Sequence, residues 1–547
     1  MLTIHLSIVV FLPLAAGLLG LFVPRAARFI GIAGAVAVLG YAIAMLLDFD
    51  SGGGLQYATD DIWIEELGIH WALAVDGLNL WLVALTAALW VPAAVVCWKR
   101  KWDRPQHVFF HLGLAETAVL GAFLAQDLAV FVVFFDVMLV PFYFLVGIWG
   151  EGRRVAATTK LMIYTLAGSL LMLVGAIALG VLSTPDGGEP SFLLSDLAER
   201  GLEEGTQQWI FLLFAIAFLV KAPAFPFHGW MPDAYRAMPI PILLVFSGVV
   251  SKVGVYGFLR IVLPTMPEAS QHFQELLIVI AVISILYGSV LAFSQTEARL
   301  VVGYSSIAQL GFITLGIFSL DPKGAQGALM QMVNHGLVAA ALFLIIAVLA
   351  QRAGSESLER MGGIALRAPV LAALFLIVTF ATLAMPGSPN FVGEILILFG
   401  TFEDKLVYGL VASIGVVLAA VYMLRIFQGA MHNRVGATVD SRDLCRLDIG
   451  TIAPIVAIVV ALGVYPQVIL ESTEKDTVSK IAAARAVAHP APVPAALPPQ
   501  PGAPQFQVQP GGPPVEGDPG APPVEVQPGG PPVEVQPGSP PEEVPVP

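Results

Sequence analysis

Residues 209–260 read WIFLLFAIAFLVKAPAFPFHGWMPDAYRAMPIPILLVFSGVVSKVGVYGFLR, two apolar stretches that each carry a lysine near mid-length. A charged side chain at the bilayer centre costs roughly 2.5–3.5 kcal/mol on insertion scales, so Lys221 and Lys252 require an explanation. Pro223 and Pro226 follow Lys221 directly, and each proline removes a backbone donor and interrupts an α-helix. A broken helix at membrane depth is tolerated where protein or water covers it. The stretch therefore predicts a membrane protein with buried lysines, one of them beside a helix break.

The composition indicates a protein that crosses the membrane many times. Of 547 residues, 57% are hydrophobic and 12% are charged, which excludes a large soluble domain. Two cysteines, Cys97 and Cys445, are too few for a disulfide framework, an iron–sulfur cluster or a zinc site. The sequence also has no glycine-rich nucleotide fingerprint between a strand and a helix. We therefore expect no cofactor or metal bound by this chain, and any redox group on a partner.

Apolar windows of about 20 residues, the length that spans a bilayer, occur fourteen times. They lie near residues 4–23, 27–47, 78–98, 108–125, 128–149, 160–182, 209–231, 240–263, 275–293, 299–319, 325–350, 368–402, 406–428 and 449–470. The windows predict an all-α polytopic membrane protein with fourteen transmembrane helices.

Basic residues are distributed unequally between the loops. Seventeen follow odd-numbered spans, whereas only Arg200, Lys323 and Lys405 follow even-numbered spans up to the twelfth. Short loops rich in lysine and arginine stay in the cytoplasm. The odd loops are therefore predicted to be cytoplasmic, with both termini on the outer face of the cell inner (cytoplasmic) membrane.

The C-terminal segment has a different composition from the rest of the chain. Beyond about residue 471 it is rich in proline, glycine, valine and glutamate, and QPGGPPVE occurs at both 509 and 527. Such a segment buries too little apolar surface to offset its chain entropy. We expect residues 471–547 to form a disordered tail outside the membrane.

Seven ionisable residues are predicted to lie inside the spans: Glu116, Asp136, Lys221, His228, Lys252, His335 and Glu394. One such residue alone is equally well explained by snorkelling or by charge pairing between packed helices. Seven in one bundle favour an ion pathway. Polar pairs four residues apart share a helix face and form stripes that can hold water, namely Ser247/Ser251, Ser305/Gln309 and Gln331/His335.

Two proline-broken segments resemble each other. Residues 221–226, KAPAFP, interrupt the seventh span, and residues 385–389, MPGSP, interrupt the twelfth. Each is the fourth helix of a five-helix set, helices 4–8 and 9–13, and the two sets start on opposite sides of the membrane. Broken helices in inverted repeats are typical of transporters with ion sites at mid-membrane. The predicted organisation is 1–107 (helices 1–3), 108–263 (first repeat), 264–430 (second repeat), 431–470 (helix 14) and 471–547 (tail).

Several motifs resemble the antiporter-like membrane subunits of respiratory complex I, the proton-pumping NADH:quinone oxidoreductase. They are AVDGLNL at 74–80, DVMLVPFYFLVGIWG at 136–150, KAPAFPFHGWMPDA at 221–234, YSSIAQLGF at 304–312, VNHGL at 333–337 and MPGSPNFVGE at 385–394. The resemblance implies a proton-translocating subunit of that enzyme without a redox centre of its own. It also implies flavin, iron–sulfur clusters and quinone in partner subunits, and L- and N-type antiporter-like subunits on either side. No nucleic acid partner is expected.

The resemblance also assigns a proton path to individual residues. The family's helix-five acid falls on Asp136, its lysines of helices seven and eight on Lys221 and Lys252, its helix-eleven histidine on His335 and its helix-twelve terminal group on Glu394. A glutamate at the last position resembles the M-type branch, because L- and N-type subunits typically have lysine there. Weaker candidates are His228, Glu116 and Gln309.

Two departures from the family pattern affect this path. Asp136 is one methylene shorter than the family's usual glutamate, which makes a water bridge to Lys221 plausible. Gln309 stands where some M-type subunits have histidine, so a relay there needs water.

The expected mechanism is electrostatic. An apolar site disfavours a charged lysine and a nearby carboxylate favours it, so movement of Asp136 relative to Lys221 changes the lysine's proton affinity. The proton would then pass by Lys252 and His335 toward Glu394. Three alternatives stay open: a subunit of a multisubunit sodium/proton antiporter, which Glu394 disfavours, the membrane arm of a proton-pumping hydrogenase, and a scaffold that moves no protons.

Overall fold

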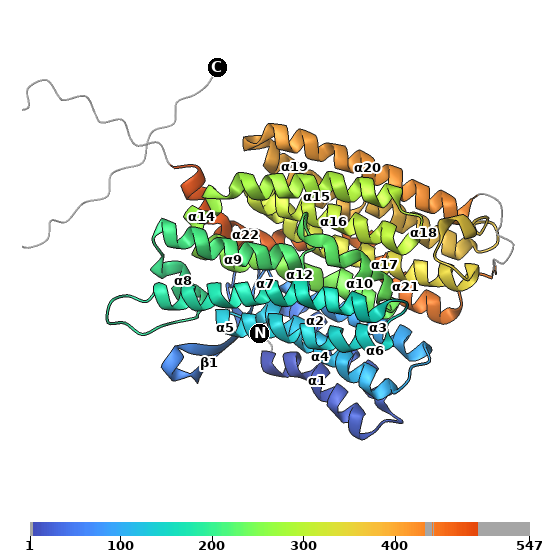
Figure 1. The fold of residues 1–547 in the computed structure, drawn as a ribbon, viewed down its shortest axis with the longest axis horizontal. Coiled ribbons are helices and arrows are strands. Elements are labelled where there is room, and N and C mark those ends of the chain that lie inside the picture. Colours follow the sequence, from blue (N-terminus) through green and yellow to red (C-terminus); the bar gives the residue numbers. More distant parts are fainter. Residues whose placement is uncertain (1–3, 433–439, 441, 491–547) are drawn as a thin grey trace, which may run out of the picture. The chain divides into compact units, whose positions relative to one another are not determined.

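The fold was analysed in a computed structural model, which describes residues 4–432, 440 and 442–490. Helices dominate it and run mostly side by side (Figure 1). Their bounds are α1 Leu6–Phe22, α2 Ala27–Asp48, α3 Leu80–Lys99, α4 Pro105–Leu124, α5 Leu128–Val137, α6 Leu139–Trp149, α7 Arg154–Leu182, α8 Leu194–Arg200, α9 Glu204–Lys221, α10 Met231–Ala237, α11 Ile240–Val245, α12 Ser251–Gly257, α13 Leu263–Thr265, α14 Pro267–His272, α15 Gln274–Ser294, α16 Ala298–Phe318, α17 Pro322–Ala353, α18 Pro369–Thr382, α19 Pro389–Asp404, α20 Leu406–Met431, α21 Arg446–Val464 and α22 Gln467–Ala488.

Eleven helical segments within the described residues are long and apolar enough to cross a membrane. They are α2, α3, α4, α5 with α6, α7, the continuous segment Ile240–Thr265, α15, α16, α17, α20 and α21. Two further apolar helices, α1 and α18, are shorter. The expectation of a helical protein with many membrane spans is confirmed.

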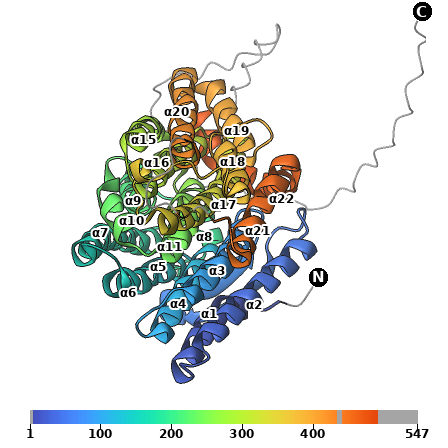
Figure 2. The same ribbon diagram turned by 90° about the vertical axis from the view of Figure 1, so that its right-hand side faces the viewer.

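Two of the seven predicted ionisable residues, Lys252 and His335, lie on the most deeply buried helices. In the apolar 18-residue stretch that defines each span, 100% of the stretch is buried in Ile240–Thr265, and 94% is buried in α16 and in α17. Figure 2, which looks nearly along the helices, shows α17 between the N-terminal helices α1 to α4 and the later helices α19 and α20. Polar side chains on α12, α16 and α17 are therefore shielded from lipid by other helices.

Both helix breaks predicted from prolines are present. Helix α9 ends at Lys221, and the chain turns before the 3₁₀ segment Phe227–Trp230. Trp230 Nε1 donates to Val220 O at 3.1 Å, which satisfies a carbonyl near the end of α9. In the second break, Asn334 Nδ2 donates to Pro389 O at 2.8 Å at the start of α19. The first contact satisfies a carbonyl at the break after α9, and the second fixes the start of α19 against α17.

The expectation of an all-α fold is wrong in the loop between α2 and α3. Strands β1 Gln56–Ile64 and β2 Ile69–Val75 pair antiparallel, with Asp60 opposite Ala72. Figure 1 shows β1 beyond the ends of the neighbouring helices. Isoleucine, threonine and aromatic residues within these segments favour strands. The acidic residues of the loop obscured that pattern in the sequence.

The predicted start of the tail at residue 471 is also wrong, because α22 extends to Ala488. Its buried residues are Ile469, Thr473, Thr477, Ile481 and Ala484. That spacing of three and four residues forms one face of an amphipathic helix, which composition alone did not reveal. The repeats at 509 and 527 lie outside the described residues.

Helix α22 is attached to the start of α3 by hydrogen bonds. Gly77 N donates to Asp476 Oδ2 at 2.6 Å, and Trp81 Nε1 donates to Ser472 Oγ at 2.7 Å. A Cβ atom at position 77 would collide with Ser472 O. The close approach of the two segments therefore requires glycine at this position.

Substitutions of Asp476 should show how firmly α22 is held. Burial, together with the charge of Asp76, raises the pKa of the Asp476 carboxyl, and the Gly77 N–H opposes the shift. A carboxyl whose folded-state pKa is raised favours the docked helix at acid pH, and this contribution is lost as pH rises through that pKa. Asp476→Asn, which keeps an acceptor for Gly77, should hold α22 at neutral pH at least as firmly as aspartate. Asp476→Ala should loosen it by about 1 kcal/mol, the net value of a hydrogen bond.

Hydrogen exchange of the α22 amides, measured at acid and neutral pH and corrected for intrinsic rates, tests this prediction. Exposed Glu474 on the same helix provides a matched control, Glu474→Gln, which should leave exchange unchanged. Faster exchange in Asp476→Asn than in wild type at neutral pH would contradict it.

Candidate functional site

Lys221 lies at the C-terminal end of α9 and is only 5% exposed. Its Nζ atom stands 4.5 Å from the ring centroid of Phe135, in cation–π geometry. The neighbouring Asp136 is half-buried, and its Oδ1 atom has no hydrogen-bond partner among the described groups. Asp136 and Lys221 attract each other electrostatically, but no direct hydrogen bond joins them within the described part of the chain. A water molecule between them would satisfy the buried carboxylate oxygen.

Lys252 is fully buried on α12. Its Nζ atom donates to Ser247 O at 2.6 Å and to Ser251 Oγ at 3.3 Å. Two π-helical segments, Phe246–Val250 and Phe258–Val262, flank α12. A wider helical turn removes regular backbone hydrogen bonds and is frequent at functional sites. Here it leaves the Ser247 carbonyl available to the ammonium group.

Polar contacts continue from Lys252 across to α16 and α17. Ser247 Oγ lies 3.4 Å from Ser306 Oγ, and Ser306 Oγ lies 3.2 Å from His335 Nε2. His335 is 3% exposed, and its Nδ1 atom has no partner among the described residues. Serine hydroxyls and a histidine ring both donate and accept hydrogen bonds. The hydroxyls of Ser247 and Ser306 can therefore pass a proton to His335. Lys252 contacts the Ser247 carbonyl and the Ser251 hydroxyl, so water would have to link its ammonium group to the Ser247 hydroxyl.

A second group of buried polar side chains surrounds Glu394 on α19. Gln309 Nε2 donates to Glu394 Oε1 at 2.9 Å, and Gln331 Nε2 donates to Gln309 Oε1 at 2.6 Å. Glu394 is 2% exposed, and its Oε2 atom has no partner among the described groups. Gln331 and His335 are four residues apart on α17, about 6 Å along the axis, so this helix carries members of both groups.

Unpartnered polar atoms concentrate on α17 and α19. Gln331 Oε1, Asn334 Oδ1, His335 Nδ1, Glu394 Oε2 and both side-chain polar atoms of Asn390 are buried without a hydrogen-bond partner among the described residues. Buried polar groups are normally hydrogen-bonded to protein or water. The region between His335 and Glu394 is thus suited to ordered water, which would complete the connection between the two groups.

The weaker candidates lie in different surroundings. Gln309 belongs to the Glu394 group, as described above. His228 follows the break after α9, where its ring packs 5.1 Å from the Tyr287 ring centroid. Glu116 faces a small cavity next to Pro13, Gly31 and Trp90, and none of the five main candidates lines this cavity. The structure therefore does not connect Glu116 to the path through α12, α16 and α17.

A buried ion pair between Asp76 and Arg260 was not predicted from the sequence. Arg260 Nη1 donates to Asp76 Oδ2 at 2.7 Å and Arg260 Nη2 to Asp76 Oδ1 at 2.8 Å, while Arg260 Nε donates to the Tyr256 hydroxyl at 2.7 Å. The sequence does show a charged residue, Arg260, near the end of an apolar span, which could have indicated a buried ion pair. The partner, 184 residues away, could not be identified from spacing.

Sequence comparison places this geometry in a known family. Residues 125–420 match the family described as "NADH:quinone oxidoreductase/Mrp antiporter, TM". The chain belongs to this family of antiporter-type membrane subunits.

Its relatives include NADH-quinone oxidoreductase subunit M of Rickettsia bellii, 33% identical over 85% of this chain and 96% of the relative. Subunit M of Escherichia coli K12 is 37% identical over 76% of this chain and 84% of the relative.

Solved structures agree on the fold. A chain of respiratory complex I from Thermus thermophilus, with bound NADH, matches with a TM-score of 0.81 and 30% identity, covering 88% of this chain and 99% of that one. A chain of the Mrp complex from Dietzia sp. matches with a TM-score of 0.77 at 21% identity, over 88% of this chain and 99% of that one. The second likeness supports the fold alone.

Proposed function

We propose that this chain is the M-type proton-translocating subunit in the membrane arm of respiratory complex I. The observation that carries the proposal is the presence of two neighbouring groups of buried polar contacts on α12, α16, α17 and α19, one around Lys252 and His335 and one around Gln331 and Glu394. Buried ionisable groups are costly in a membrane protein and mark ion pathways. As a member of an enzyme complex, the chain would act as a translocase, with flavin, iron–sulfur clusters and quinone in partner subunits.

Asp136 and Lys221 would control entry of the proton into this path. The apolar surroundings of Lys221 disfavour its charged form, and the Asp136 carboxylate favours it. The absence of a direct bond between them allows a small movement, or loss of a bridging water, to change the lysine's proton affinity. Quinone reduction in other subunits would drive that movement as a coupling free energy.

The proposed proton route leads from Lys221 to Lys252, then by water to the hydroxyls of Ser247 and Ser306 and on to His335. Water between His335 and Glu394 would complete it, since Gln309 and Gln331 do not titrate. Glu394 is the terminal station and releases the proton to the outer face. L- and N-type subunits typically carry lysine at the position of Glu394. The glutamate therefore favours the M-type assignment over a subunit of a sodium/proton antiporter.

We also propose fourteen transmembrane helices. Besides the eleven candidate spans, α1, α9 with its continuation after the break, and α18 with α19 each supply one span. Helices 4–8 and 9–13 would then form the inverted repeats. By the loop charges, both termini lie on the outer face of the inner membrane, and L- and N-type subunits flank the chain.

The carboxylate at position 136 provides a test of the entry step. Asp136→Asn keeps the shape of the side chain and removes its charge, so we expect most proton pumping to be lost in an assembled complex. Asp136→Glu restores the longer acid and should have a mild effect. Proton uptake and NADH oxidation in inside-out vesicles measure both. Normal pumping by assembled Asp136→Asn would remove Asp136 from the mechanism and favour a scaffold role at this site.

A further inference from the structure

A long apolar groove lies beside α17, the helix that carries His335. It has a volume of about 600 Å³ between α2, α3, α17 and α21. Ala88, Leu337 and Ile455 contribute to its walls, and Ile43 and Ile458 on its rim are 47% and 38% exposed. All four helices are candidate membrane spans. The groove therefore lies among membrane-spanning segments.

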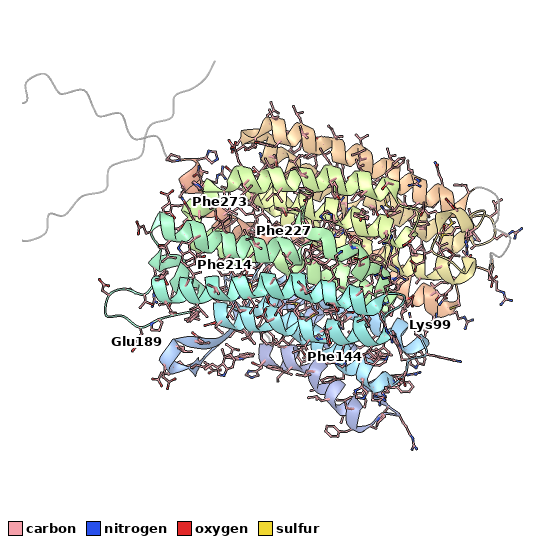
Figure 3. All side chains as sticks on the ribbon, in the orientation of Figure 1. Lys99, Phe144, Glu189, Phe214, Phe227 and Phe273 are labelled. Atoms are coloured by element: carbon pink, nitrogen blue, oxygen red, sulfur yellow. The ribbon has the colours of Figure 1, made fainter. Side chains whose placement is uncertain are left out.

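Contacts at its two ends show that α3 and α21 run antiparallel along the groove. Lys99 at the end of α3 donates to Asp448 at the start of α21, at 2.6 Å, and Figure 3 shows Lys99 at one end of the bundle. At the other end, Trp81 contacts Ser472, which follows α21. The lining of α3 from Trp81 to Val95 extends over about 21 Å at 1.5 Å per residue. That length is most of a hydrocarbon core of about 30 Å.

An unneutralised cation lies at the Lys99 end of the groove. Arg446 lines the groove and is exposed, and it has no hydrogen-bond or ion-pair partner among the described residues. The carboxylates near it in sequence have other partners: Asp448 is paired with Lys99, and Asp443 accepts hydrogen bonds from Val370 N and Leu371 N. The loop charges predict that this end faces the cytoplasm. Basic pockets between transmembrane helices on that side attract anionic lipid head groups.

The walls and the charge of the groove favour an anionic lipid as its occupant. Its α3 wall is apolar over the length of an acyl chain, and the Arg446 cation stands at one end. We propose that the groove binds one anionic phospholipid, with an acyl chain along Ala88 and Ile455 and its phosphate at Arg446. Leu337, two residues from His335, lines the same groove, so the lipid would contact the helix that carries the proton path.

Photo-crosslinking of the intact complex tests the site. Nanodiscs would contain phosphatidylglycerol or phosphatidylethanolamine with a diazirine in the acyl chain, and mass spectrometry would quantify adducts on α3 peptides. Wild type should give more adducts with phosphatidylglycerol. Arg446→Gln should reduce that preference about five-fold, because one basic residue near an anionic surface contributes about 1 kcal/mol. Ala88→Trp, which fills the groove, should reduce adducts of both lipids.

Two matched variants serve as controls for loss of a positive charge and for added side-chain volume outside the groove. Arg153→Gln removes an exposed basic residue of another predicted cytoplasmic loop, and Leu170→Trp enlarges a residue on α7 that is 50% exposed. Neither should change the α3 adducts. An unchanged lipid preference in Arg446→Gln would overturn the proposal. So would crosslinking of an Ala88→Cys variant to another subunit, since a protein helix would then occupy the groove.

Discussion

Replacing Lys221 by alanine should reduce proton pumping below about one tenth of wild type, because a positioned proton-transfer group contributes roughly 10²–10⁴-fold. The complex should still assemble. Lys221 is 5% exposed, and its ammonium group packs on the ring of Phe135. Alanine breaks no hydrogen bond to another described residue, although Asp136 loses a nearby positive charge. The loss would be one of proton transfer and not of folding.

Lys221→Arg separates the need for charge from the need for proton release. Arginine keeps the cation but does not release its proton in proteins, so this variant should also fail to pump. Lys160→Ala is a matched control: its exposed pair with Asp233, at 2.9 Å, contributes only about 0–1 kcal/mol. Proton uptake and NADH oxidation in vesicles provide the measurement. Wild-type pumping in assembled Lys221→Ala would show that the entry step does not use this lysine.

Glu394→Gln should strongly reduce both pumping and quinone reductase activity in an assembled complex. Glutamine has the same shape, and its amide oxygen can still accept the Gln309 Nε2 hydrogen bond that Glu394 Oε1 accepts at 2.9 Å. The substitution therefore removes titration and preserves the contact. Glu403→Gln, at an exposed position of the same helix that pairs with Lys323, serves as the control and should have wild-type activity. Full coupling in Glu394→Gln would leave Lys252 and His335 as the last protein groups before the exit.

Glu394→Lys should retain part of both activities, because the surrounding amides can reverse their direction. If Gln309 turns its oxygen toward a lysine ammonium, its NH₂ group needs a new acceptor. Gln331 Oε1 has no partner among the described residues and can supply that acceptor after its own amide turns. Activity of Glu394→Lys no higher than that of Glu394→Gln would show that the amide pair is fixed and that the site requires a carboxyl group.

The membrane class, the positions of the helix breaks and the principal ionisable residues were predictable from the sequence. Apolar length, proline position and a lysine within an apolar run are local properties, and the cost of burying charge makes Lys221, Lys252 and Glu394 conspicuous. The residues that connect them were less conspicuous. Ser306 is an ordinary serine in an apolar helix, and only its position between Ser247 and His335 gives it a place in the path.

The sequence by itself thus determined that the chain crosses the membrane many times and which residues are costly to bury there, because each depends on a window of about 20 residues. Only the tertiary structure decided which of these residues meet. It placed His335 against Ser306, Glu116 near Pro13, Asp76 against Arg260 and α22 against Gly77. Such contacts link segments far apart in the chain, and they depend on how whole helices pack.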